Sequence, residues 1–267
     1  MAPHSGMVSG MDPHASQPAT RLLKLIDDLG EHLTLLQEQE VRTVEVSPET
    51  LHALSTAPAA APPPPSPQPP PRHSGEPDLS SPLDAIAERI AHCRLCGLCE
   101  TRNHTVPGQG SAHPEIMFIG EGPGADEDRQ GLAFVGRAGG LLTKIIEAMG
   151  YEREAVWIGN IVKCRPPENR VPTPEEMKSC LPYLREQIAL LQPKVIVCLG
   201  ATAVKGLFET KIGITKLRGQ WMTFEGIDVM PTYHPAYLLR NPPAKREVWE
   251  DMQEVMRKLG RPVPEKK

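Results

Sequence analysis

The sequence has 267 residues, with 29 Lys and Arg against 33 Asp and Glu and only 4% aromatic residues. A net charge of −4 gives no bulk electrostatic reason to expect a nucleic-acid binder. No stretch approaches the ~18 uninterrupted apolar residues that a membrane helix needs. The N-terminus lacks the basic and apolar regions of a secretory signal. Six cysteines in such a chain favour metal ligands over a disulfide scaffold, so we expect a cytoplasmic protein without membrane association.

Residues 1–55 predict a mostly disordered extension that contains one amphipathic helix. Its apolar residues recur at spacings of three and four among acidic ones: Leu22, Ile26, Leu29, Leu33 and Leu36. An isolated helix of this length is marginal in water, so the apolar seam needs a partner. The partner could be a second copy, through self-association of residues 21–41, another protein or the main domain, and the sequence does not choose among these.

Residues 56–82 are rich in proline and predict an extended linker, partly in polyproline II conformation. Such a run could also dock a protein partner. Residues 1–75 hold four basic and eight acidic residues, which leaves 25 of each sign in the rest of the chain. The net acidity therefore belongs to the N-terminal part, and the remainder is free to gather Lys and Arg on one face.

Residues 83–262 alternate between predicted strands and helices. Apolar runs predict buried strands at 116–120, 156–162, 194–200 and 227–232. Helices are predicted at 84–92, 138–149, 173–191, 201–208 and 244–259. This alternation is typical of a parallel sheet with helices on both faces. We therefore predict an α/β domain with three layers, α/β/α, around a central four-stranded parallel sheet.

The conspicuous residues of this domain follow the predicted strands. A glycine-rich turn at 120–124 follows the first strand, Asn160 ends the second, and His234 follows the fourth. Sites in parallel sheets lie at the carboxyl ends of the strands, so these residues should meet. The turn lacks the spacing of a dinucleotide or P-loop motif, and by itself it indicates only exposed backbone amides near a ligand.

Four cysteines combine a C-x2-C pair with two distant single residues: Cys93, Cys96, Cys164 and Cys180. Four thiolates suit a [4Fe–4S] cluster or a zinc ion, although unrelated thiols remain an alternative. Cys99 lies close enough in sequence to make the ligand set ambiguous. Cys198 lies within an apolar strand and is expected to be an ordinary core residue.

Several segments occur together in a fixed order: Cys93-x2-Cys96-x-Leu98, GEGPGADED (120–128), GLAFVGRAGGLL (131–142), GNIVKCRPPENRVPTPEE (159–176), Cys180 and HPAYLLR (234–240). In this order and spacing they resemble the family 4 uracil-DNA glycosylases, the iron–sulfur branch of the uracil-DNA glycosylase superfamily. The resemblance runs from about Ile86 to Leu259 and does not extend to residues 1–75. It implies the same four-stranded α/β fold that the strand pattern predicts.

The resemblance also assigns roles to individual residues. It implies a [4Fe–4S] cluster on Cys93, Cys96, Cys164 and Cys180, with Cys99 left unmatched. It implies a uracil site in which Gly120, Glu121 and Gly122 touch the base, Phe134 stacks on it, Asn160 reads its edge and His234 lies near the glycosidic bond. Glu127 and Asn169 match positions near the water or the sugar.

Cleavage of the glycosidic bond of deoxyuridine requires a base drawn out of the helix and a stabilised uracil anion. An aromatic face, an amide and a hydrogen-bond donor at O2 suit this task, and the matched residues supply these groups. The candidates for catalysis are His234, Glu121, Glu127 and Asn169. Asp126 and Asp128 are expected to be an ordinary solvated turn.

Basic residues that flank the motifs are expected to contact the phosphates of single- or double-stranded uracil-containing DNA: Lys163, Arg165, Arg170 and Arg240, with Lys245 and Arg246 as further candidates. Tyr237, Leu238 or Leu239 is a candidate wedge for the gap that the flipped base leaves.

Three other readings stay open: a DNA-damage binder without turnover, a covalent uracil-DNA trap, and a zinc-stabilised domain. Superfamily members that trap uracil-DNA covalently carry an insertion with a reactive histidine after the second strand. Residues 163–167 contain no histidine, which disfavours a covalent trap.

Overall fold

The structure is a computed structural model that describes residues 80–263. The predicted N-terminal helix, the contact surface at 21–41 and nearly all of the proposed linker lie outside the described residues. Within residues 80–263, no helix is both long enough and apolar enough to cross a membrane.

A single sheet runs through the described domain, with the strand order β1-β3-β2-β4-β6-β5. Four parallel strands form its centre: β2 (Ile116–Gly120), β3 (Trp157–Asn160), β4 (Val195–Leu199) and β6 (Ile227–Thr232). These are the four predicted strands, so the central parallel sheet is confirmed. Two short antiparallel strands, β1 (Gln109–Gly110) and β5 (Met222–Phe224), extend the edges and make the sheet six-stranded rather than four-stranded.

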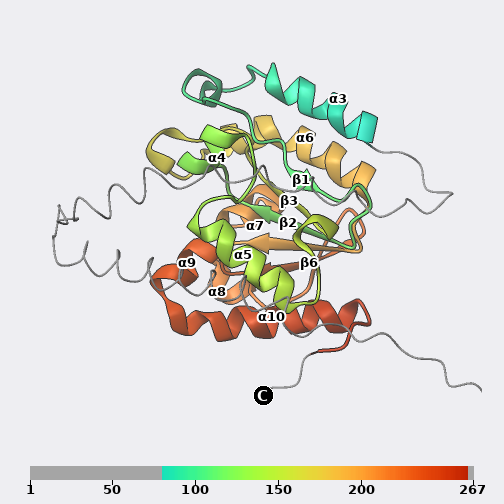
Figure 1. The fold of residues 1–267 in the computed structure, drawn as a ribbon. Helices are drawn as coiled ribbons and strands as arrows, with labels where there is room; N and C mark the ends of the chain where they lie inside the picture. The colour runs from blue at the N-terminus through green and yellow to red at the C-terminus, as the bar shows by residue number, and fades with distance from the viewer. Residues whose placement is uncertain (1–79, 264–267) are drawn as a thin grey trace, which may run out of the picture. The chain divides into compact units, whose positions relative to one another are not determined.

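Helices cover both faces of this sheet (Figure 1). The α-helices are α3 (Ser80–Ala91), α4 (Ala125–Gln130), α5 (Arg137–Ala148), α6 (Pro174–Leu191), α7 (Ala201–Phe208), α8 (Ile214–Leu217), α9 (Pro235–Arg240) and α10 (Lys245–Lys258). Short 3-10 turns are η1 (Gly97–Glu100), η2 (Arg153–Ala155), η3 (Pro167–Asn169) and η4 (Pro242–Ala244). The helices α4, α8 and α9 were not predicted, whereas α3, α5, α6, α7 and α10 match predicted helices within a few residues.

The three layers follow from the alternation of side chains along each strand. Phe118 on β2 packs in a core with Leu142 of α5 and Met252 of α10. Ile119, the next residue, points to the opposite face and packs in a second core with Leu184 of α6. Every residue of β2 and β4 is buried, as expected for strands covered on both sides.

Helix α6 begins where the sequence predicts. The Thr173 hydroxyl accepts a hydrogen bond from the Glu176 backbone N–H, and the Glu176 carboxylate accepts one from the Thr173 N–H, which forms a capping box. Pro174 occupies the first helical position, where its missing N–H costs nothing. This start fixes the register of Cys180 and Gln187 further along the helix.

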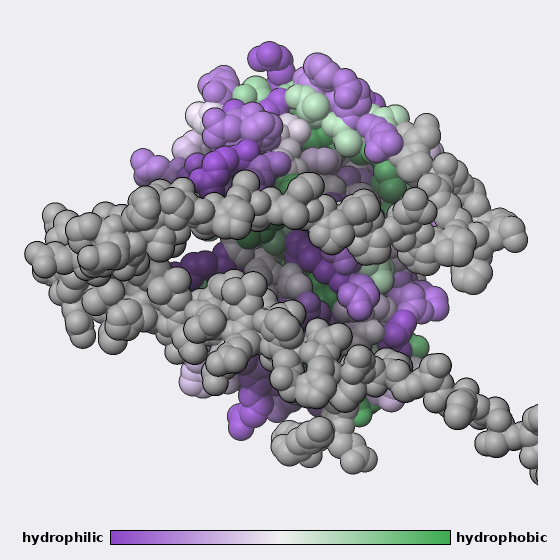
Figure 2. Space-filling view, in the orientation of Figure 1, coloured by the Kyte–Doolittle hydropathy of each residue, from purple (hydrophilic) through white to green (hydrophobic). Residues whose placement is uncertain are grey.

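The described surface in view is mainly hydrophilic, with small scattered apolar areas (Figure 2). Large apolar side chains that remain exposed are Leu95, Leu132, Val171, Ile212, Tyr237 and Leu239.

Candidate functional site

A pocket of about 230 Å³ opens at the carboxyl ends of the parallel strands. It brings together most of the predicted site residues: Glu121, Gly122, Glu127, Phe134, Asn160, Asn169, Arg170 and His234. Gly120 lies directly behind the pocket wall, where an added Cβ would be 2.5 Å from both Asn160 Oδ1 and Phe134 Cζ. Only glycine at this position therefore lets the amide and the ring approach each other.

Asn160 presents an unused hydrogen-bonding atom to the pocket. The residue ends β3 and is 1% exposed, yet its Oδ1 has no hydrogen-bond partner within the described protein. Its backbone carbonyl accepts a hydrogen bond from Lys163 Nζ at 3.0 Å. Buried polar atoms in folded proteins are nearly always paired, so an unpaired acceptor that lines a cavity indicates a site for a ligand that donates a hydrogen bond.

Phe134 is held in a strained backbone conformation. Its φ is +52°, in the left-handed region that residues with a side chain seldom adopt. The Arg153 guanidinium donates to the Ala133 and Phe134 carbonyls at 2.8 and 3.0 Å, and Gln109 Oε1 accepts from the Ala133 N–H. These contacts fix the ring 5.6 Å from the His234 ring, tilted by 30°. Strain that is held by several contacts is common at functional sites. Sequence motifs did not indicate Arg153 or Gln109, because their partners lie far away along the chain.

Glu127 joins the glycine-rich turn to the loop that carries Phe134. Its Oε1 accepts from the Val135 and Gly136 N–H groups at 2.9 and 3.0 Å, and its Oε2 accepts from the Gly124 N–H at 3.0 Å. A carboxylate offers about four acceptor positions, so roughly one remains for another donor in the pocket.

His234 is the N-cap of α9 and has a defined tautomer. Its Nδ1 accepts a hydrogen bond from the Ala236 backbone N–H at 3.1 Å, so the ring proton lies on Nε2. Burial, together with the charge of Arg240, lowers the pKa of His234 to about 4, although Glu127 opposes this effect. Gly200, with φ +91°, gives the ring space, since a Cβ there would lie 3.1 Å from the His234 Cβ. His234 is therefore a neutral hydrogen-bond donor at neutral pH.

Of the two carboxylates expected in a solvated turn, Asp126 is solvent-accessible and Asp128 is not. The Thr202 hydroxyl donates to Glu121 Oε2 at 2.5 Å, which holds the Glu121 side chain. Asp126 is partly exposed and pairs with Arg129. Asp128, expected on the surface, is fully buried and accepts hydrogen bonds from the Asn103 backbone and side chain, which anchors the segment that follows the first cysteines.

Two of the predicted DNA-binding arginines lie beside the pocket and already have partners. Arg165 Nε donates to Asn169 Oδ1 at 2.8 Å. Arg170 forms two hydrogen bonds with the Glu176 carboxylate and thereby lowers the pKa of that carboxyl. Arg240 is exposed at the end of α9.

Lys163 does not lie on a DNA-facing surface, so that prediction is wrong. The side chain is 1% exposed, and Nζ donates to Asn160 O at 3.0 Å and to Gln187 Oε1 at 2.8 Å. Burial lowers the pKa of Lys163 to about 8. A phosphate cannot reach this ammonium group without opening of the core.

The candidate wedge narrows to two side chains. Leu238 is 1% exposed and belongs to the core, so it cannot enter DNA. Tyr237 and Leu239 on the same helix are 39% and 38% exposed. The Tyr237 ring also packs against Tyr233, with the ring centroids 4.9 Å apart and the planes tilted by 38°, which leaves Leu239 as the freer apolar side chain.

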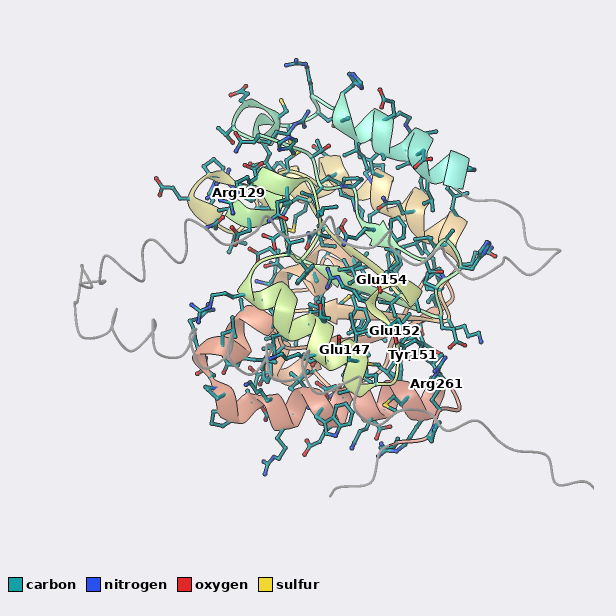
Figure 3. The ribbon with its side chains drawn as sticks, viewed as in Figure 1. Arg129, Glu147, Tyr151, Glu152, Glu154 and Arg261 are labelled. Atoms are coloured by element: carbon teal, nitrogen blue, oxygen red, sulfur yellow. The ribbon has the colours of Figure 1, made fainter. Side chains whose placement is uncertain are left out.

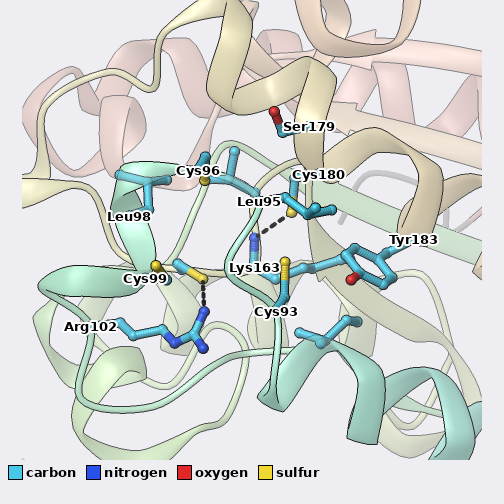
Figure 4. Close-up of a pocket in the computed structure, with 13 residues that line it drawn as sticks. Cys93, Leu95, Cys96, Leu98, Cys99, Arg102, Lys163, Ser179, Cys180 and Tyr183 are labelled. Carbon is cyan, nitrogen blue, oxygen red and sulfur yellow. Dashed lines mark hydrogen bonds between the residues drawn. The ribbon is translucent and has the colours of Figure 1, made fainter.

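A second cavity is lined by five of the six cysteines: Cys93, Cys96, Cys99, Cys164 and Cys180 (Figure 4). Two of the sulfur atoms accept hydrogen bonds, Cys164 Sγ from Arg102 Nη1 at 3.1 Å and Cys180 Sγ from the Lys163 backbone N–H at 3.3 Å. Cys198 lies away from this cavity, fully buried in β4, as predicted.

The thiols around this cavity have the donor chemistry of an iron–sulfur or zinc site. Among residues 80–263, no three His, Cys, Asp or Glu side chains lie close enough together to hold a single metal ion. Burial raises the pKa of the thiols of Cys96, Cys164 and Cys180, the last to about 11. Thiolates at these positions therefore require a positively charged partner, and the N–H donors from Arg102 and Lys163 would support such thiolates.

The family model described as "Uracil DNA glycosylase superfamily" matches residues 107–253. The chain is 46% identical over 177 residues to a "Type-4 uracil-DNA glycosylase" of Thermotoga maritima. The aligned residues cover 64% of this chain and 91% of that protein. A protein of the same name from Sulfurisphaera tokodaii is 46% identical over 65% of this chain and 83% of its own length. Another from Archaeoglobus fulgidus is 41% identical over 68% of this chain and 96% of its own length.

Proposed function

The chain belongs to the uracil DNA glycosylase superfamily, and we propose that it is a type-4 enzyme that hydrolyses the N-glycosidic bond of deoxyuridine in DNA. Uracil is released and an abasic site remains for base-excision repair. One observation about the site carries the proposal. The buried Oδ1 of Asn160 has no hydrogen-bond partner in the described part of the chain, and it lies in a pocket lined by Phe134 and His234.

Base recognition follows from the hydrogen-bonding pattern of uracil. The base presents an N3–H donor beside the O4 acceptor, and the amide of Asn160 presents an acceptor beside a donor. Oδ1 would accept from N3–H while Nδ2 donates to O4. Cytosine has an acceptor at N3 and an amino donor at C4, so the same amide would place acceptor against acceptor and donor against donor. The Phe134 ring supplies a flat apolar face on which the extruded base stacks.

The leaving group is stabilised by a donor that needs no change of protonation. As the bond to the sugar breaks, negative charge develops on the uracil ring and its O2. His234, neutral with its proton on Nε2, can donate a hydrogen bond to that oxygen. A preorganised donor in a site shielded from solvent stabilises such charge more strongly than water does.

The attacking water is placed by the polar side chains around the sugar side of the pocket. Glu127 keeps one acceptor position after its three backbone contacts, and the Asn169 amide is fixed through Arg165. Glu121, held by Thr202, lines the same pocket. A reaction with strong positive charge on the sugar needs little general-base assistance, so water placement is the main task of these groups.

The four matched cysteines, Cys93, Cys96, Cys164 and Cys180, would hold a [4Fe–4S] cluster. The similarity to type-4 uracil-DNA glycosylases, together with the gathering of these thiols around one cavity, supports this assignment over a single zinc ion. When bound, the cluster supplies cross-links between three segments: the one before η1, the loop after β3 and helix α6. Those links stabilise the loop next to Asn160.

DNA is contacted through the rim of the pocket. Arg165, Arg170 and Arg240 lie around it and would pair with phosphates on either side of the flipped nucleotide. Leu239 would fill the gap in a duplex. Residues 83–262 form the glycosylase domain in this proposal, with residues 1–55 and 56–82 as its extension and linker.

The proposal is tested with an end-labelled oligonucleotide that carries one uracil, followed by alkali and a denaturing gel. Cleavage at uracil, and not at cytosine or thymine in the same position, is expected for single and double strands. An intact strand with brown, folded protein would refute turnover. A band of lower mobility that survives denaturation would identify a covalent trap instead.

A further inference from the structure

Lys163 and Gln187 form a buried polar bridge between the cysteine cavity and the uracil pocket. Lys163 Nζ donates to Asn160 O at 3.0 Å and to Gln187 Oε1 at 2.8 Å. Gln187 Nε2 donates in turn to Pro107 O at 2.8 Å. Both side chains are 1% exposed. We call this set the Lys163–Gln187 bridge.

The bridge is costly to bury, which indicates a role beyond packing. Removal of an ammonium group from water is unfavourable unless hydrogen bonds and charge replace its hydration. Among residues 80–263, no carboxylate pairs with Lys163, and its two acceptors are a backbone carbonyl and an amide oxygen. An apolar side chain of similar size would fill the same volume without that cost.

One end of the bridge determines the position of Asn160. The contact at the backbone carbonyl fixes the last residue of β3, from which the recognition amide projects. The Asn160 Oδ1 atom has no partner within the described protein, so its position in the absence of base depends on its backbone and on packing. A shift of about 1 Å at such a group is enough to lower a rate about a hundredfold.

The other end of the bridge lies on the element that carries a cysteine ligand. Gln187 and Cys180 both belong to α6, and the Lys163 backbone N–H donates to Cys180 Sγ at 3.3 Å. Lys163 therefore contacts the cysteine cavity through its backbone (Figure 4). Its side chain contacts the recognition residue Asn160. The neighbouring Cys164 belongs to the same cavity.

We propose that Lys163 and Gln187 are positioning residues for uracil recognition, which align the Asn160 amide through its backbone carbonyl and couple that alignment to α6. The inference rests on the proposed function, since it assumes that Asn160 reads uracil. It assigns Lys163 a role that differs from phosphate contact.

The test compares holoenzymes with Lys163→Met and Gln187→Met against wild type, at equal iron content per chain. Two quantities are measured: kcat/KM on a uracil oligonucleotide and the inhibition constant of free uracil. Each variant removes buried hydrogen bonds to or from a charged group, so we expect both quantities to worsen by about tenfold to a hundredfold. A purely structural role would lower the active fraction and leave the inhibition constant unchanged.

Tyr151→Phe serves as a matched control near the amino ends of the parallel strands, at the end of the sheet opposite the pocket. The Tyr151 hydroxyl donates to Glu115 Oε2 at 3.0 Å, next to Arg261 (Figure 3). Glu115 precedes β2 and thus lies at the amino ends of the strands, away from the pocket. This variant should lose stability and keep the inhibition constant of uracil.

The outcomes separate the two hypotheses. A wild-type enzyme that neither cleaves uracil DNA nor is inhibited by uracil refutes the proposed function itself. An active wild type together with variants whose inhibition constants stay within about twofold overturns the positioning role alone. Should Lys163→Met not fold, Gln187→Met decides the matter, because it keeps the ammonium group and its contact with Asn160 while removing the second anchor.

Discussion

Glu127 gives the sharpest test of how the pocket is assembled. All three of its backbone contacts hold the glycine-rich turn against the loop of Phe134. In Glu127→Gln, the amide must place its NH2 group against at least one backbone N–H. The favoured orientation keeps the oxygen at the Val135 and Gly136 donors and leaves the Gly124 N–H facing another donor. The Gly124 N–H is partly buried, and leaving such a donor unsatisfied costs about 1–3 kcal/mol.

This cost can be measured as a loss of thermal stability. For a domain of this size, 1 kcal/mol shifts Tm by about 2–4 °C, so Glu127→Gln should lower Tm by about 2–12 °C. Because the Phe134 loop loosens, kcat/KM should fall about tenfold to a hundredfold. Asp126→Asn is the matched control, since it removes the same charge from the same helix at an exposed ion pair with Arg129, worth about 0–1 kcal/mol.

The result separates loop anchoring from water placement. If Glu127 acted only on the attacking water, the glutamine variant would lose activity and keep the wild-type Tm. A Tm equal to that of Asp126→Asn would therefore refute the anchoring role.

Three further predictions concern the rest of the site. The pKa of His234 is about 4 in the folded protein and about 6.5 in the unfolded chain. The stability that neutral His234 provides is therefore complete above pH 6.5 and is lost as the pH falls towards 4, so the Tm of wild type should fall relative to that of His234→Gln across this range. Curves of Tm against pH that run parallel for the two proteins would contradict the assignment. Leu239→Ala should reduce kcat/KM on double-stranded more than on single-stranded uracil DNA, because only a duplex has a gap to fill; equal losses would exclude a wedge. Arg165→Ala should lower the slope of log affinity against log salt by about 1, measured by fluorescence anisotropy, and an unchanged slope would exclude a phosphate contact.

The central sheet could be predicted because buried parallel strands leave a strong local pattern. The apolar runs 116–120, 156–162, 194–200 and 227–232 each became a strand of the centre. The edge strands β1 and β5 span only two and three residues, and their pairing depends on neighbours rather than on their own composition. Helix α9 does have a local sequence signal, because Pro235 after His234 fits the first position of a helix.

The sequence predicted the residues that line the pocket but not the residues that hold them in place. Parallel strands bring their carboxyl ends together, so the turn at 120–124, Asn160 and His234 had to meet. Lys163 was misplaced because a lysine among the motifs looks exposed, and its acceptor, Gln187, lies 24 residues further along the chain. The support of Phe134 by Arg153 likewise depends on contacts that only the folded chain creates.

The kcat/KM of Asn160→Ala on matched uracil and cytosine oligonucleotides tests most directly the proposal that Asn160 reads uracil in this pocket. The variant loses two hydrogen bonds to the base in a buried site, so kcat/KM at uracil should fall by about tenfold to a thousandfold while the protein stays folded. Free uracil should inhibit the variant correspondingly less than wild type. A variant with wild-type kcat/KM and wild-type inhibition by uracil would contradict the assignment of this pocket.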